Sequence, residues 1–212
     1  MKKIGFLIFI LALAGCNVGG IRGNGHIVTQ SREVTPFVNV KASGAFDVEW
    51  RNGPPSMSVT VDENLMPFIE ASVTDRTLRV STSRSVNPTH SIKLSLSSPA
   101  REGASLSGAS RFNAPQLNGA RFSLTTAGAS KAMLDGAVGE LIASMTGASE
   151  LRAESLQTKT AEIDVTGAGS ARVNVSDTLK ASITGAGKVE YSGNPAHVEK
   201  HITGAGSIKK RD

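Results

Sequence analysis

The chain has 212 residues, of which 22 are glycine and 4% are aromatic, and its formal net charge is +5. A chain of this length forms one domain or two small ones. The positive charge is too small and too evenly spread to indicate a nucleic-acid-binding protein, so we expect no nucleic-acid partner.

The first sixteen residues have the layout of a secretory signal. Lys2 and Lys3 precede an uncharged apolar run over 4–14, which is shorter than the roughly 20 residues of a membrane-spanning helix. The run ends in Leu-Ala-Gly-Cys, which resembles the lipobox of bacterial lipoproteins, and Cys16 is the single cysteine of the chain. The resemblance implies that 1–15 is a cleaved lipoprotein signal peptide and that Cys16 carries the lipid. In the alternative, an ordinary signal peptide, Cys16 would be a free thiol in an oxidising compartment.

Residues 16–25 are mostly glycine and small polar residues. Such a segment buries too little apolar surface to order itself, so we predict a flexible tether. Asn17 stands where an aspartate would resemble the inner-membrane retention signal of enteric lipoproteins, which favours the outer membrane. We therefore expect a protein of the bacterial cell envelope that is lipid-anchored on the periplasmic or the surface face of the outer membrane.

Residues 26–100 contain short runs in which apolar and polar residues alternate. The runs SMSVTV, RTLRVSTS and SIKLSLS have the period of two that is typical of strands with one buried face. Between them, Asp62 is a candidate N-cap for a short helical turn that Pro67 would kink or end. We expect two or three irregular coils in this half of the chain.

Residues 101–212 contain a repeat of 18 to 20 residues, in which a small residue precedes Gly-Ala. Mostly apolar residues stand two and four before the glycine and four and six after it, whereas a helix would need spacings of three and four. Stacking such copies buries their apolar rows, which predicts an all-β parallel β-helix with about three short strands per coil. A glycine at each bend allows a positive φ. The predicted turn glycines are Gly44, Gly108, Gly128, Gly147, Gly167, Gly185 and Gly204.

A family resemblance rests on three segments. VTPFVNVKASGAFDVEW, VTVDENLMPFIEASV and TLRV precede the Gly-Ala series, and together they resemble the autotransporter adhesin head GIN domain family over residues 24–208. The resemblance implies a right-handed β-helix, which we expect to form one domain over 26–212. It brings no catalytic residues, metal or cofactor, so the protein is expected not to be an enzyme.

Three chemical alternatives fit the sequence less well. Gly185, Gly187 and Lys188 resemble the end of a phosphate-binding loop in spacing only, because Val189 replaces the required Ser or Thr and the motif recurs in register. His197 and His201 would lie roughly 13 Å apart on a strand, too far to share a metal. A polysaccharide-active enzyme would need two paired carboxylates, and the outward carboxylates of the repeats stand alone. These carboxylates are Glu150, Asp164 and Glu190.

Two outward rows are candidate binding surfaces. A basic side chain stands three or five residues after the glycine of each coil, which predicts a basic stripe that could meet acidic glycans, lipopolysaccharide phosphates or anionic lipid headgroups. The basic stripe comprises Arg111, Lys131, Arg152, Arg172, Lys188 and Lys209. Glu150 and Glu190 interrupt it, so a merely solvated charged face is the alternative. A Ser/Thr row before the glycine resembles ice-binding arrays, but Asp164 and His201 break its regularity.

These observations favour a non-enzymatic protein that presents a rigid surface to a glycan, lipopolysaccharide or an envelope protein. The first alternative is a structural or assembly element, because a parallel β-helix exposes strand edges at both ends. Lys209, Lys210 and Arg211 place charge at the C-terminal end and oppose stacking there. We therefore expect a monomer or a small oligomer. A polysaccharide-active β-helix enzyme is the second alternative.

Overall fold

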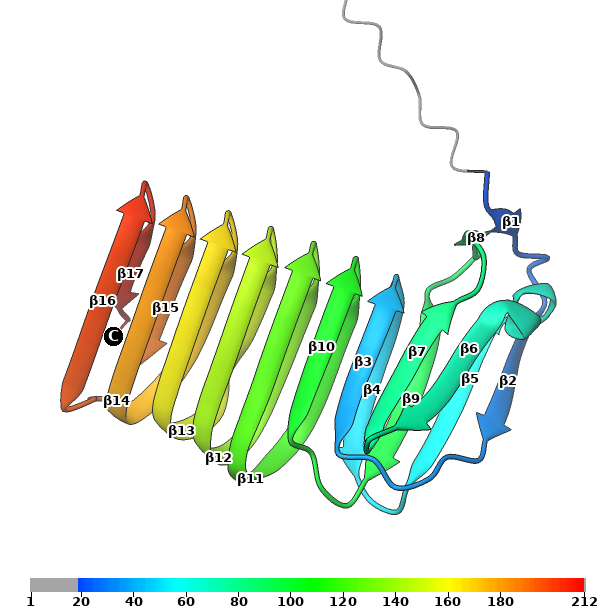
Figure 1. Ribbon diagram of the computed structural model, residues 1–212, viewed down its shortest axis with the longest axis horizontal. Helices are drawn as coiled ribbons and strands as arrows, with labels where there is room; N and C mark the ends of the chain where they lie inside the picture. The colour runs from blue at the N-terminus through cyan, green and yellow to red at the C-terminus, as the bar shows by residue number, and fades with distance from the viewer. Residues whose placement is uncertain (1–18, 212) are drawn as a thin grey trace, which may run out of the picture.

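A computed structural model describes residues 19–211, most of which wind into a β-solenoid (Figure 1). In this view the nearer strands run upward, the farther strands run downward and the chain advances to the left, which is a right-handed winding. The predicted all-β parallel β-helix is thereby confirmed. Among the described residues, no helix is long and apolar enough to cross a membrane.

The regular part of the solenoid begins at β10 (Gly103–Gly108) and contains one strand of 16 to 18 residues per full coil. These long strands break only at the Gly-Ala corner and pair in parallel with the corners aligned, Gly128 beside Gly147 and Gly147 beside Gly167. Register shifts after Ala114 and after Met133 absorb the differences in coil length. The remaining strands are β11 (Arg111–Gly128), β12 (Lys131–Gly147), β13 (Glu150–Gly167), β14 (Ser170–Gly185), β15 (Lys188–Ser192), β16 (His197–Gly204) and β17 (Ser207–Lys210).

Each coil has three faces, in agreement with the predicted three short strands. In β13 the inward residues fall into three groups, Leu151 with Ala153, Leu156 with Thr158, and Ala161 with Ile163 and Val165. We call these stretches face 1, face 2 and face 3, counted from the corner. Along the stack, bulky and small residues alternate, which keeps the filled volume of successive coils similar. One such column on face 1 is Phe112, Ala132, Leu151, Ala171 and Val189.

The N-terminal half differs from a simple succession of coils. One coil, β3 (Asn39–Gly44) and β4 (Phe46–Asn52), lies between β10–β11 on one side and β7 (Thr77–Thr82) with β9 (Ile92–Ser98) on the other. The order of coils in space is therefore not the order in the chain. Beyond this coil the strands are antiparallel, β6 (Ile69–Thr74) to β7, β5 (Ser56–Asp62) to β9 and β2 (Ile27–Arg32) to β5. The two-residue link between β6 and β7 explains why these two strands are antiparallel, since a parallel crossover needs a dozen residues or more.

The antiparallel strands form a cap over the N-terminal end of the core. The predicted helical turn is η1 (Glu63–Phe68), a 3₁₀ helix that contains Pro67 and buries Leu65. Arg32 of β2 donates hydrogen bonds to the carbonyl oxygens of Ile69, at 2.6 Å, and Met66, at 3.3 Å, and so joins β2 to β6 and η1 across the end of the solenoid. The cap therefore covers apolar side chains that an open coil would expose.

The passage from β9 to β10 crosses the β3–β4 coil and is held by a buried arginine. Arg101, 4% exposed, donates hydrogen bonds from its guanidinium to the carbonyl oxygens of Trp50, Pro115 and Gln116. Burial lowers the pKa of this guanidinium. Trp50 itself packs on the ring of Phe37 and on the edges of two further phenylalanine rings, at the point where the two halves of the core meet.

The segment that precedes β2 is docked on the cap. β1 (Ile21–Arg22) pairs with β8 (Val86–Asn87), and the buried carboxylate of Asp62 accepts hydrogen bonds from the backbone of Gly25 and from the backbone and hydroxyl of Thr89. Asp62 therefore does not cap η1. Burial raises the pKa of Asp62, but these hydrogen bonds outweigh burial and place the pKa below its usual value. Residues 21–25 are thus held in place, unlike the flexible tether expected over 16–25. Cys16 and the predicted signal peptide over 1–15 lie outside the described residues.

Candidate binding surface

The Gly-Ala corner allows successive coils to pack closely. At Gly128 φ is +102°, and a Cβ there would lie 2.5 Å from the carbonyl oxygen of Gly108 in the preceding coil. The other corners of the repeat have the same geometry. At the corner that resembles a phosphate loop, the N–H groups of Ala186 and Lys188 donate to the carbonyl oxygens of the preceding coil at 2.9 Å. These groups are therefore not available to cradle a phosphate.

The residue after Gly-Ala divides the coils into two types. The first three regular coils have serine there, and Ser110, Ser130 and Ser149 are buried with their hydroxyls donating to corner carbonyl oxygens. The later coils have glycine there, with valine or isoleucine two residues before the corner. A Cβ on Gly187 would lie 2.7 Å from Val165 Cγ1 and 3.2 Å from Ile183 Cγ2. The Gly-x-Gly pattern is thus a consequence of core packing.

The basic stripe lies in two adjacent outward rows of face 1. In the first row Arg111 is beside Lys131, and in the second row Arg152 is beside Arg172. Lys188 belongs to the first row, and Lys209, beside Glu190, belongs to the second. The structure therefore places all six predicted basic residues on one face, together with the carboxylates that were expected to interrupt them.

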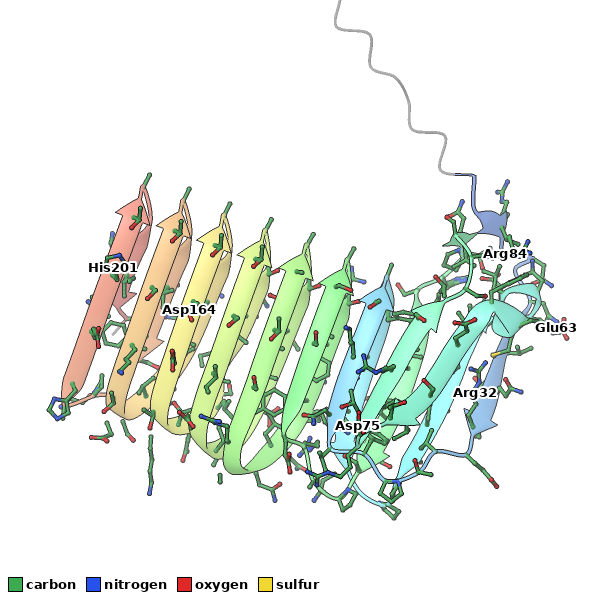
Figure 2. The ribbon with its side chains drawn as sticks, in the orientation of Figure 1. Arg32, Glu63, Asp75, Arg84, Asp164 and His201 are labelled. Carbon is green, nitrogen blue, oxygen red and sulfur yellow. The ribbon has the colours of Figure 1, made fainter. Side chains whose placement is uncertain are left out.

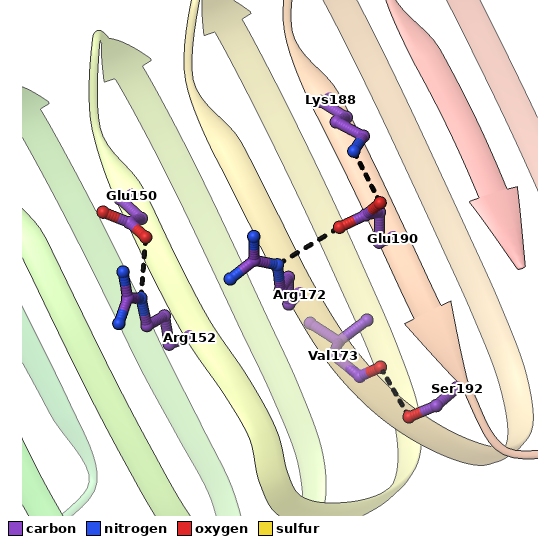
Figure 3. Close-up of polar contacts among 7 residues, drawn as sticks. All are labelled: Glu150, Arg152, Arg172, Val173, Lys188, Glu190 and Ser192. Carbon is purple, nitrogen blue, oxygen red and sulfur yellow. Dashed lines mark hydrogen bonds and ion pairs between the residues drawn. The ribbon is translucent and has the colours of Figure 1, made fainter. Parts of the chain in front are cut away.

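Two glutamates neutralise much of the stripe (Figure 3). Glu150 forms ion pairs with Lys131 at 3.3 Å and, as Figure 3 shows, with Arg152 at 2.7 Å. Glu190 does the same with Lys188 at 2.5 Å and Arg172 at 3.1 Å. The hydrogen bond from Arg152 lowers the pKa of Glu150, and those from Lys188 and then Arg172 lower the pKa of Glu190. Both carboxylates therefore stay ionised at neutral pH, and the stripe carries charges of both signs.

Arg111 differs from these residues, because it has no ion-pair partner within 4.0 Å among residues 19–211. It lines a groove of about 400 Å³ on face 1. Met133, 49% exposed, lies in the same groove and is one of four large apolar side chains exposed in the described chain. The groove, called the face 1 groove below, is bounded by Asp47, Arg111, Asn113, Lys131, Met133 and Arg152, with Glu150.

The face 1 groove combines three cationic side chains, two carboxylates, an amide and an exposed thioether. This set can bind an anionic group next to a weakly polar ring, as in an acidic sugar. Sequence reasoning selected the cations of the groove and missed Met133 and Asn113. Met133 could have been noticed in the sequence, because it is an apolar residue at an outward position of the repeat where the other coils carry polar residues.

The other outward residues do not gather into a site. Asp164 and His201 lie in one row of face 3, separated by Ser182 of β14 (Figure 2). Four threonines of the next row stand in register from Thr146 to Thr203, whereas the row of Asp164 is mixed. Between residues 19 and 211 no three His, Cys, Asp or Glu side chains lie close enough together to hold a metal ion.

Comparisons with solved structures agree with this fold. A protein described as a putative adhesin from Bacteroides fragilis is 19% identical and has a TM-score of 0.74, with 91% of this chain and 100% of that chain covered. A putative lipid binding protein from Parabacteroides distasonis is 22% identical with a TM-score of 0.61, and a putative adhesin from Parabacteroides merdae is 24% identical with a TM-score of 0.55. Each of these two pairs covers 91% of this chain and 99% of the other. At these identities the similarity shows the fold alone.

A comparison with curated protein sequences found no match. A family model, in contrast, matches residues 36–195, which is most of the chain. This range lies inside the 24–208 over which the sequence resembled the same family, so the resemblance is confirmed. The chain belongs to the family described as "Putative auto-transporter adhesin, head GIN domain".

Proposed function

We propose that this protein is a non-catalytic protein of the bacterial cell envelope with an adhesin-like role, which binds acidic glycans or the phosphates of lipopolysaccharide through the face 1 groove. The observation that carries this proposal is the combination, in one groove, of the unpaired Arg111, the neighbouring Lys131 and the exposed Met133. Membership of an adhesin family and the description of two structural neighbours as adhesins support the general role.

The fold supports a rigid, oriented display of the groove. We propose that Cys16 carries the lipid anchor in the outer membrane. Ile21 of β1 is then only five residue steps from the anchor, which limits the distance to about 18 Å at ~3.6 Å per residue. The cap end would lie next to the membrane and the C-terminal coils would point away from it. Seven steps of ~4.8 Å from β7 to β16 give a stack about 34 Å tall.

The test is binding of the chain expressed from Asn17, without lipid, to lipopolysaccharide and to a panel of acidic and neutral glycans at low and high salt. We expect binding to acidic ligands that weakens with salt, because exposed charges are screened over about 8 Å at physiological ionic strength. Arg111→Ser combined with Lys131→Ser should weaken binding at least tenfold. The matched control is Arg172→Ser combined with Lys188→Ser, which removes two stripe cations outside the groove.

Each outcome has a definite meaning. Loss in the groove variant with retention in the control supports the proposal. Equal losses in both variants would assign binding to the overall charge of the stripe and overturn the groove. Binding that neither variant changes would exclude face 1, and an absence of binding to every acidic ligand would refute the ligand class.

A further inference from the structure

Within residues 19–211 no further element covers the coil formed by β16 and β17. β16 pairs only with β14, and β17 pairs only with β15, so within the described part of the chain one edge of each strand has no strand partner. In Figure 1 no further element lies beyond β16 at the left end. All eight residues of β16 are exposed. The N-terminal end is different, because β2, β6 and η1 cover it.

Side chains in core columns are open to solvent on this coil. Val198 and Ile202 stand in the columns of Leu179 and Ile183, which are fully buried, yet they are 40% and 42% exposed. Lys200 stands between them, in the column of the buried Ala181. The end surface thus presents an apolar, a cationic and a second apolar side chain along one strand.

Lys200 is folded over the end of the core. Its ammonium lies 5.0 Å from the ring centroid of Tyr191 and donates a hydrogen bond of 3.4 Å to the carbonyl oxygen of Ile208. A covering layer would bury this cation with no acidic partner of its own. An unpaired buried charge is strongly unfavourable, so an apolar cover is a poor fit and an acidic side chain opposite Lys200 is a good one.

The surrounding charge points the same way. Lys209 and Lys210 of β17, followed by Arg211, lie on the same coil, with Glu199 as the acidic residue of β16. End-to-end contact between two copies through this coil would set these cations against one another. A partner with acidic side chains meets complementary charge instead.

We propose that the terminal coil binds an extended segment of another protein as an additional β-strand. The segment carries an apolar, an acidic and an apolar residue at alternate positions, facing Val198, Lys200 and Ile202. Alternate residues of a strand share one face, so this pattern matches the exposed row. Main-chain hydrogen bonds to the open edge supply affinity and the three side chains supply specificity, as in other cases of strand addition.

The test uses the chain expressed from Asn17 and two ten-residue peptides with the centres Val-Thr-Glu-Thr-Val and Val-Thr-Lys-Thr-Val. Binding is measured by calorimetry, and the site by hydrogen exchange of the β16 amides. We expect the glutamate peptide to bind at least tenfold more tightly and to slow exchange in β16. Lys200→Glu should reverse the preference, whereas Lys159→Glu, the same charge change at an exposed position of β13, should leave it unchanged.

Ile202→Ser is a second variant, at a side chain that is 42% exposed. It should weaken binding of the glutamate peptide. Native exchange protection in β11 to β13 checks that each variant is folded. Equal affinity for the two peptides, or an unchanged preference in Lys200→Glu, would overturn the proposal. So would an absence of binding at millimolar peptide. A concentration-dependent dimer that Ile202→Ser abolishes would assign the coil to a second copy and overturn it as well.

Discussion

The two types of corner lead to a quantitative prediction for Gly187. Replacing it with serine imitates the earlier coils, and its φ lies outside the positive range, so the backbone permits the change. The main obstacle is Val165 Cγ1, at 2.7 Å from the new Cβ, while Ile183 Cγ2 and the carbonyl oxygen of Gly169 both lie at 3.2 Å. Overpacking of this kind costs about 1–3 kcal/mol of unfolding free energy.

Shortening Val165 should relieve the contact. Val165→Ala alone removes two buried methyl groups, which at about 0.8 kcal/mol each, with a term for the cavity, costs about 2 kcal/mol. In that background Gly187→Ser should cost little, because the nearest atom has gone and the serine hydroxyl can reach the corner carbonyl as in Ser149. The two changes should therefore couple by about 1–2 kcal/mol.

The assay is urea unfolding followed by far-ultraviolet circular dichroism and by fluorescence of Trp50, the single tryptophan. Coincident transitions are required for a two-state free energy, since long repeat arrays can lose cooperativity. Gly128→Ala is the control, because its Cβ would meet a backbone oxygen at positive φ and trimming a side chain should not rescue it. If the costs of Val165→Ala and Gly187→Ser add within about 0.5 kcal/mol, the packing explanation is refuted.

Three further changes test the N-terminal half by the same unfolding assay. Asp62→Asn should cost about 1–3 kcal/mol of unfolding free energy at pH 7. Because the pKa of Asp62 is lowered in the folded protein, its stabilising contribution is present above the unfolded pKa of about 3.9 and is lost as the pH falls through the folded pKa. The variant should therefore lose less stability than the wild type on acidification. Asp75→Asn with Arg76→Gly should raise stability by about 0.5–1 kcal/mol, since both residues have positive φ in a two-residue hairpin that favours Asn-Gly; a loss would contradict this. Arg101→Met should cost about 1–3 kcal/mol by leaving one buried and two part-buried carbonyl oxygens without their donor, and a neutral result would show that water replaces the guanidinium.

The regular half could be predicted from the sequence because its information is local and repeated. Each coil carries the same apolar offsets and the same corner, so aligning the copies also aligns the strands. The N-terminal half carries equally clear strands, but alternation does not say which edge pairs with which. The placement of β7 beside β3 depends on the short β6–β7 turn and on the crossing held by Arg101.

The candidate site, too, could be predicted from the sequence only in part. The offsets of the basic residues placed all six on one face, since a period of two fixes the direction of each side chain. The ion pairs were harder to predict from the sequence. Glu150 pairs with Lys131 of the preceding coil and with Arg152 of its own strand, and such contacts depend on the side-chain conformations. The groove around Met133 depends on the three-dimensional shape of the surface, which the sequence pattern alone does not determine.

The out-of-sequence coil bears on the order in which the chain folds. The strands that flank β3 and β4 on both sides, β7 with β9 and β10 with β11, come later in the chain. During synthesis or export from the N-terminus, this coil stays without neighbours until they have emerged. We expect slow nucleation through these distant contacts, followed by rapid addition of the C-terminal coils one by one. Removing a whole repeat should therefore change the folding rate little, whereas loosening the β7–β3 contact should slow it.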